Sequence, residues 1–137
     1  MSEANTKTSQ KMERNLPLLL KNMKKAFGQN IKGPVFQRER EFKASIKYNF
    51  LSDLVKFLFI RGVEKLAAIN TWETENNFDL AYHFITPIGK DYLDTKITII
   101  VLLPKDVKEI KSIKKQYPNA GIFESEIQIN LGIIFED

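Results

Sequence analysis

Residues 95–104 read Thr-Lys-Ile-Thr-Ile-Ile-Val-Leu-Leu-Pro and form the most strand-like stretch of the chain. Apolar and β-branched residues occur at both odd and even positions of this stretch. A strand with both faces buried has this composition, whereas a strand with one solvated face alternates between apolar and polar residues. The stretch therefore predicts the central strand of a sheet, which ends at Pro104.

Two further strands are predicted upstream of this segment. Residues 78–85 alternate with a period of two, which places apolar side chains on one face of a strand: Phe78, Leu80, Tyr82 and Phe84. Residues 63–74 predict its hairpin partner. The joining residues 75–77 include two asparagines, which tolerate positive φ, so a tight turn is expected there. Pro87-Ile88-Gly89 predicts another turn before the central strand.

A strand and a helix are predicted before this hairpin. Residues 42–47 alternate between apolar and polar side chains, as in a short half-buried strand. The next segment carries an apolar stripe at helical spacing: Leu51, Leu54, Val55 and Leu58. Asn49 or Ser52 is expected to cap the start of this helix, and Gly62 stands where a helix often ends in a left-handed residue.

The N-terminal region, residues 1–40, is predicted to differ from the rest. Residues 1–10 are polar and suggest a disordered start, residues 11–27 predict a basic amphipathic helix that begins or kinks near Pro17, and residues 29–40 read as a connector. Residues 1–33 carry a net charge of +5 and the remainder −1. The basic helix could dock on a partner, lie on a membrane surface or pack on its own domain, and we favour docking or self-packing.

The C-terminal region is harder to interpret. Residues 106–116 predict a helix with Val107, Ile110 and Ile113 facing inward. Asn119 could cap the following segment, where residues 122–131 fit either a strand or one helical face. The whole order of elements predicts an α+β fold over residues 41–137, a two-layer arrangement of a mixed β-sheet with helices packed on one face, plus the N-terminal basic helical arm.

Composition excludes several kinds of chemistry. The chain has 137 residues, 43% of them hydrophobic, no cysteine and one histidine, His83. Thiolate metal sites, disulfides and cysteine nucleophiles therefore cannot form. His83 has no nucleophile or second imidazole nearby in the sequence, so we favour a packed or surface histidine over a catalytic one. The sequence contains no Gly-rich phosphate loop, no secretory signal and no run long enough to span a membrane. Its basic residues are not interleaved with stacking aromatics, as nucleic-acid binding would require. A soluble, cytosolic chain that binds no nucleic acid is expected.

Glu124 and Glu126 are the strongest candidates in the sequence for a catalytic pair of carboxylates. On a helix they would point about 200° apart, and on a strand they would share a face. General acid–base chemistry would also need a desolvated cleft. We therefore favour two charges that make hydrogen bonds or contact a neighbour.

The C-terminal part resembles a known family. The sequence runs Ile110-Lys111-Ser112-Ile113, then Tyr117-Pro118-Asn119-Ala120-Gly121-Ile122-Phe123-Glu124-Ser125-Glu126, and ends Leu131-Gly132-Ile133-Ile134-Phe135-Glu136. It is similar to the C-terminal signature of the 30-kDa (C-type) subunit of respiratory complex I. Lys111, Ser125, Ile129 and Asn130 depart from that signature. A divergent, short member is indicated, similar to the C-type subunits of membrane-bound energy-converting [NiFe]-hydrogenases.

The resemblance implies a non-catalytic scaffold subunit that holds no cofactor of its own. It would dock on a hydrogenase-like large subunit, near a small iron–sulfur subunit. Those partners would carry the iron–sulfur clusters and, in a hydrogenase, a NiFe centre. It would lie at the cytoplasmic face of the membrane and would be attached to the membrane only indirectly, through its partners. The matching positions imply docking or fold-determining roles for Tyr117, Pro118, Phe123, Glu124, Glu126, Gly132 and Phe135. The resemblance also implies a helix followed by a turn through this motif.

Other functions remain open at this point. The chain could be the C-type subunit of a NADH/quinone oxidoreductase, or a free-standing module that binds another protein through its basic helix. A small enzyme that uses Glu124 and Glu126 is a third alternative. Apolar residues in the motif need a cover, either the domain's own core or a partner: Ile122, Phe123, Ile127 and Ile129.

Overall fold

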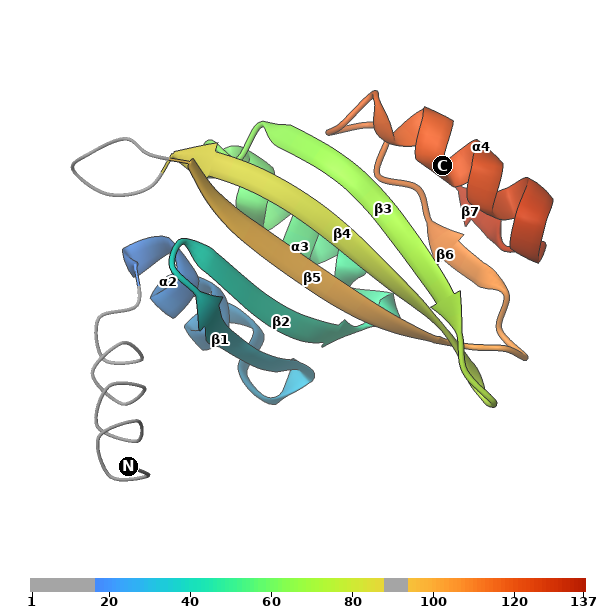
Figure 1. The fold of residues 1–137 in the computed structure, drawn as a ribbon, viewed down its shortest axis with the longest axis horizontal. Helices are drawn as coiled ribbons and strands as arrows, with labels where there is room; N and C mark the ends of the chain where they lie inside the picture. Colours follow the sequence, from blue (N-terminus) through green and yellow to red (C-terminus); the bar gives the residue numbers. More distant parts are fainter. Residues whose placement is uncertain (1–16, 88–93) are drawn as a thin grey trace.

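Strand β5 (Asp94–Pro104) lies in the middle of a five-stranded sheet, as its composition predicts. The computed structural model describes residues 17–87 and 94–137. The strand order is β1 (Ile31–Arg38), β2 (Glu41–Lys47), β5, β4 (Asn77–Pro87) and β3 (Lys65–Glu73). Only the β2–β5 pair is parallel. Figure 1 shows this sheet with helix α3 (Leu51–Ile60) behind it. The mixed sheet and its helices confirm the predicted α+β class.

Strands β3 (Lys65–Glu73) and β4 (Asn77–Pro87) form the predicted hairpin. At the turn, the Oγ1 atom of Thr74 accepts a hydrogen bond from the backbone N–H of Asn77 at 3.1 Å. The turn is where the sequence places it, but neither asparagine has positive φ, so the predicted left-handed conformation is wrong. The hydroxyl of Thr74 stabilises the turn instead. The turn predicted at Pro87-Ile88-Gly89 extends outside the described residues.

Strand β2 (Glu41–Lys47) and helix α3 (Leu51–Ile60) also match the prediction. The predicted helix cap is wrong: a 3-10 turn, η2 (Tyr48–Phe50), leads into α3, and no side chain caps its start. At the other end, Gly62 adopts φ 91°, the left-handed conformation expected after a helix.

The segment predicted as a connector, residues 29–40, is a strand for most of its length. Helix α2 (Leu18–Phe27) is followed by η1 (Gly28–Asn30) and by β1 (Ile31–Arg38), which pairs antiparallel with β2. Gly33-Pro34 forms an irregularity within the strand. Gly33 has φ 89°, and a Cβ atom there would lie 2.9 Å from the carbonyl oxygen of Lys43, so glycine lets the two backbones approach.

Helix α2 packs on the body of the protein, which was one of the alternatives for the basic helix. Leu20 and Met23 are fully buried, and the ring of Phe27 lies 5.8 Å from that of Phe57 on α3 in an edge-to-face arrangement. The predicted disordered start and the part of the helix before Pro17 lie outside the described residues.

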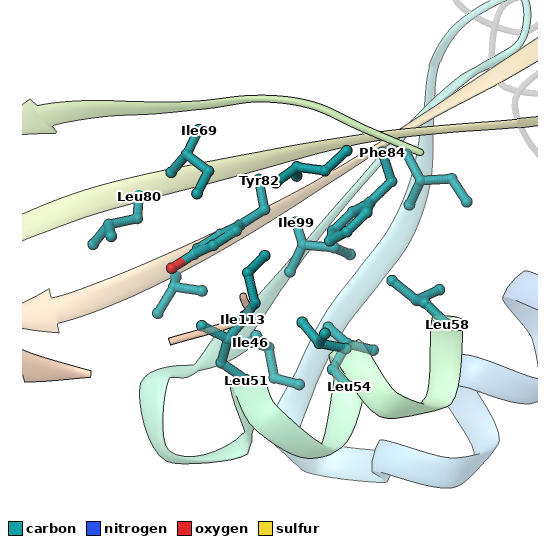
Figure 2. Packing of buried hydrophobic residues seen from close by; sticks show 14 of the residues in the cluster. Ile46, Leu51, Leu54, Leu58, Ile69, Leu80, Tyr82, Phe84, Ile99 and Ile113 are labelled. Atoms are coloured by element: carbon teal, nitrogen blue, oxygen red, sulfur yellow. The ribbon is translucent and has the colours of Figure 1, made fainter. Parts of the chain in front are cut away.

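The hydrophobic core lies between the helices and one face of the sheet. All four residues of the predicted α3 stripe are buried, and so are the four apolar residues predicted to share one face of β4. Figure 2 shows Leu54 and Leu58 of α3 on the same side of the sheet as Tyr82 and Phe84. Side chains on the other face of β5 include the exposed Leu102.

The helix predicted over residues 106–116 is wrong. The chain forms a short strand there, β6 (Glu109–Lys111), which pairs in parallel with β7 (Ile134–Glu136). Lys108 adopts φ 54°, which interrupts a right-handed helix. Ile110 and Ile113 are buried as expected. The ambiguous segment is helix α4 (Ala120–Leu131), so the helical alternative, and the helix-then-turn shape implied by the resemblance, are confirmed.

Candidate docking surface

Glu124 connects α4 to the strand segment before it. The carboxylate is 3% exposed; its Oε1 accepts a hydrogen bond from the Ser112 hydroxyl at 2.6 Å, and its Oε2 accepts one from the Ile113 backbone N–H at 2.9 Å. Both donors belong to the turn after β6. A buried carboxylate with two donors fixes the orientation of a helix strongly, because removing it would leave both donors unpaired.

Burial governs the acid–base properties of this region. Desolvation raises the pKa of Glu124 above its usual range, although the hydrogen bonds from Ser112 and Ile113 and the charge of Lys114 act in the opposite direction. Desolvation also raises the pKa of Tyr82, with a smaller contribution from the negative charge of Glu124. The Tyr82 hydroxyl, red in Figure 2, is buried and has no hydrogen-bond partner among the described residues.

Tyr117 and Asn119 attach the loop before α4 to strand β3 and the segment that precedes it. The Tyr117 hydroxyl donates to the carbonyl oxygen of Val63 at 2.5 Å, and burial raises the pKa of this phenol, with a further contribution from Glu64. The ring packs between Phe59, at 5.7 Å, and Phe84, at 5.1 Å. Asn119 does not cap α4; its side-chain amide donates to the carbonyl oxygen of Leu66 at 2.8 Å.

The end of α4 turns back through Gly132. This residue has φ 72°, and its N–H donates to the carbonyl oxygen of Gln128 at 2.9 Å, so it closes the helix in the left-handed conformation that glycine adopts without strain. Strand β7 follows and places Phe135 opposite Ile110 of β6. Phe135 is partly buried against the core.

The outer face of α4 carries two exposed isoleucines. Ile122 is 75% exposed and Ile129 is 82% exposed. Glu126, also exposed, lies between them on the same face, because these positions are separated by about one helical turn. Of the other two apolar residues that need a cover, Ile127 is buried and Phe123 is partly buried, so the domain's own core covers them.

The structure separates the seven predicted motif residues into two groups. Tyr117 and Glu124 are buried and make internal hydrogen bonds, and Phe123 and Phe135 are partly buried. Pro118, Glu126 and Gly132 are exposed. Glu124 and Glu126 lie on different sides of α4, so the helical expectation holds and they do not form a carboxylate pair. The roles of Ser112 and Asn119 were missed, because their partners lie 12 and 53 residues away.

The structure shows no arrangement suited to metal chemistry in the described part of the chain. His83 Nδ1 lies 3.1 Å from Oγ1 of Thr98, and its pKa is lowered by burial and by the charge of Lys96. Within residues 17–87 and 94–137, no three histidine, aspartate or glutamate side chains gather closely enough to hold an ion. None of the helices in those ranges combines the length and the apolar composition needed to cross a membrane.

The chain matches a known family in sequence and two solved structures in fold. The family model described as "Respiratory-chain NADH dehydrogenase, 30 Kd subunit" matches residues 39–137. A chain of the membrane-bound sulfane sulfur reductase (MBS), an archaeal respiratory membrane complex, aligns with a TM-score of 0.72 at 20% identity, covering 86% of this chain and 68% of that one. A trypsin-resistant fragment of Nqo5 aligns with a TM-score of 0.67 at 17% identity, covering 86% of this chain and 92% of the fragment. No curated protein sequence matches the chain.

Proposed function

This chain belongs to the family of the 30 Kd subunit of respiratory-chain NADH dehydrogenase, and we propose that it is a non-catalytic scaffold subunit of a membrane-bound, ion-translocating oxidoreductase. It would dock on a hydrogenase-like large subunit, close to a small iron–sulfur subunit. Those partners would carry the iron–sulfur clusters and, in a hydrogenase, the NiFe centre. The chain would lie at the cytoplasmic face of the membrane, held there by its partners.

The observation that carries the proposal is the pair of exposed isoleucines on α4. Ile122 and Ile129 are 75% and 82% exposed on a helix that Glu124 holds against the body of the protein. Exposed apolar side chains on a helix that is already ordered are suited to a permanent subunit interface, because little backbone ordering is needed on binding and apolar area is removed from water. Glu126, which lies between them, would supply a negative charge that can form an ion pair with the partner.

The kind of complex is inferred from the resemblance. Lys111, Ser125, Ile129 and Asn130 differ from the complex I signature, and divergent members of this kind resemble the C-type subunits of energy-converting hydrogenases and related ferredoxin-dependent complexes, which we therefore favour. A C-type subunit of a NADH/quinone oxidoreductase is the alternative. A free-standing module that binds through its basic helix is less favoured, because Leu20 and Met23 already pack that helix onto the body of the protein.

A mild-detergent pull-down of the chain from its native cells tests the proposal. We expect a hydrogenase-like large subunit and cluster-bearing subunits to co-purify, with viologen-linked hydrogenase activity. Quinone reductase activity in place of hydrogenase activity would move the chain to a respiratory dehydrogenase. Recovery of the chain alone from the soluble fraction would contradict the scaffold role.

A pair of variants locates the interface. The double substitution Ile122→Asp/Ile129→Asp places charges in the proposed interface and should abolish co-purification while the chain remains folded, because both side chains are exposed. Leu18→Asp on α2 is the matched control, since Leu18 is 71% exposed. If Leu18→Asp abolishes co-purification and the α4 variant does not, the chain binds its partner through the basic helix instead.

A further inference from the structure

A cavity opens at one end of the sheet, away from any residue of the C-terminal motif. It has a volume of about 560 Å³ and lies where β2, β4 and β5 meet the turns η1 and η2. Leu102 and Pro104 of β5 contribute apolar surface to it. Leu102 is 46% exposed, although it belongs to the central strand of the sheet.

The charged side chains that line the cavity are both basic. Lys32 on β1 and Lys47 on β2 line it, and none of its lining residues is acidic. Neither lysine has an ion-pair partner within the ranges that the structure describes. By contrast, Lys111 and Lys114 in the C-terminal region are paired with Glu136 and Asp137. The cavity therefore attracts negative charge that the described residues do not supply.

The remaining polar groups of the cavity are side-chain amides. Four of them line it: Gln29, Asn30, Asn49 and Asn77. An amide offers both a donor and an acceptor, which is the pattern that a peptide backbone needs. A small inorganic anion would gain nothing from the apolar surface of Leu102 and Pro104, whereas a peptide can bury an apolar side chain there.

The neighbouring strand gives the occupant an orientation. On the same face of the sheet, Leu102 lies between Lys47 of β2 and Asp79 of β4, its two register partners. The Oδ1 atom of Asp79 is buried and has no hydrogen-bond partner in the described part of the chain. Acidic groups of a ligand would therefore lie over β2, and an N–H donor would lie over β4.

From this arrangement we propose that the cavity binds an extended, acidic peptide segment of a partner subunit. The carboxylates of the segment pair with Lys32 and Lys47, an apolar side chain covers Leu102, and the amides bond its backbone. The proposal rests on the scaffold role in one respect, because the occupant belongs to a partner subunit, but it uses none of the residues of the α4 face. Loss of co-purification with intact peptide binding would count against the scaffold role, whereas loss of peptide binding with intact co-purification would count against this cavity alone.

The test is a binding titration with the purified full chain. The probe is a fluorescent peptide of alternating glutamate and leucine, about six residues long, which spans roughly 20 Å when extended. We expect saturable binding that Lys32→Glu/Lys47→Glu weakens by about tenfold, as loss of two ion pairs and gain of two repulsions predict. The same variant should gain affinity for a lysine–leucine peptide. Leu102→Ser should weaken binding of the acidic peptide without a change of fold.

Matched controls separate this site from general electrostatic attraction. Lys56→Glu/Lys115→Glu changes the net charge equally at exposed positions outside the cavity and should leave the affinity nearly unchanged. A glutamate–serine peptide should bind weakly, because it cannot cover Leu102. Equal binding of the serine peptide, equal loss in the control variant, or displacement by millimolar inorganic phosphate or by vesicles of anionic lipid would overturn the proposal.

Discussion

The Ser112 hydroxyl donates a 2.6 Å hydrogen bond to Oε1 of Glu124, a carboxylate that is 3% exposed. This contact joins the turn after β6 to helix α4. Together with the bond from the Ile113 N–H at 2.9 Å, it determines how α4 lies on the protein. Glu124 is thus a positioning residue for the exposed face of α4, although it cannot itself reach a partner.

Glu124→Ala should destabilise the fold strongly. The substitution leaves the Ile113 N–H buried without an acceptor and removes a charge-assisted bond from Ser112, so we expect a loss of about 2–4 kcal/mol in the free energy of unfolding. Ser112→Ala removes one donor and leaves the carboxylate its second bond, and should cost about 1–2 kcal/mol. Urea denaturation measures both values. Equal costs for the two variants would contradict the role given to Ile113.

The stability contributed by Glu124 should depend on pH. Its pKa is raised by burial above the ordinary value of 4.5, so the folded protein holds this proton more tightly than the unfolded chain does. The contribution is therefore greatest below the unfolded pKa and decreases as the pH rises through the folded pKa. Glu124→Gln removes this titration. The difference in free energy of unfolding between the wild type and this variant should shift against the wild type as pH rises.

That difference is measured by urea denaturation at a series of pH values from about 4 to about 8, which cover the ionisation of a carboxyl group with a raised pKa. Taking the difference in free energy of unfolding between the wild type and Glu124→Gln cancels the contribution of the other carboxylates, which titrate in both proteins. A difference that does not change with pH would show that burial does not raise this pKa.

Two buried tyrosines should respond oppositely to loss of the hydroxyl. Tyr117→Phe removes the hydroxyl that donates a hydrogen bond to the carbonyl oxygen of Val63, and it should destabilise the protein by about 1–2 kcal/mol. Tyr82→Phe removes a hydroxyl that is buried without a partner among the described residues, so it should be neutral or stabilise by up to about 1 kcal/mol. Thermal or urea denaturation separates them. A large loss in Tyr82→Phe would mean that its hydroxyl has a partner.

Alanine substitutions at two glycines of the motif region should change the stability of the protein in opposite directions. Gly132 has φ 72° with no atom within 4 Å of an added Cβ, so Gly132→Ala should cost about 1 kcal/mol through backbone strain alone. Gly121 lies in the first turn of α4, and an added Cβ meets only the flexible side chain of Lys114, at 3.1 Å. Gly121→Ala should therefore stabilise the helix by up to about 1 kcal/mol. Denaturation midpoints report both effects, and a gain in Gly132→Ala would contradict the proposed cap.

Elements whose pattern is local could be predicted from the sequence, and those that depend on distant pairing could not. The alternation in β4 and the stripe of α3 are visible within one segment. Strand β1 was missed because Gly33-Pro34 is typical of a turn, and only the approach to Lys43 explains it. The sequence around β6 predicts a helix because Val107, Ile110 and Ile113 recur at every third position, whereas the partner strand β7 lies about 25 residues later.

The same limit applies to the candidate surface. The resemblance singled out Glu124 and Phe123, but no pattern in the sequence indicates that Glu124 bonds to Ser112 or that Phe123 turns toward the core. On one helix, the spacing of Ile122 and Ile129 is as consistent with a buried face as with an exposed one. Only the position of Ile127 relative to the sheet distinguishes the two faces.

The exposed and inward-facing residues of α4 should therefore differ in their effect on assembly. Ile129→Ser should lower recovery of the partner subunits in the pull-down and leave the stability of the isolated chain nearly unchanged, because the side chain is 82% exposed. Phe123→Ala should lower both, because the ring packs partly against the core and truncation of a large aromatic residue commonly costs about 2 kcal/mol or more. Denaturation of each purified chain, measured beside co-purification, separates docking from folding. If Ile129→Ser assembles normally while Phe123→Ala assembles poorly only in proportion to its lost stability, the outer face of α4 is not the interface.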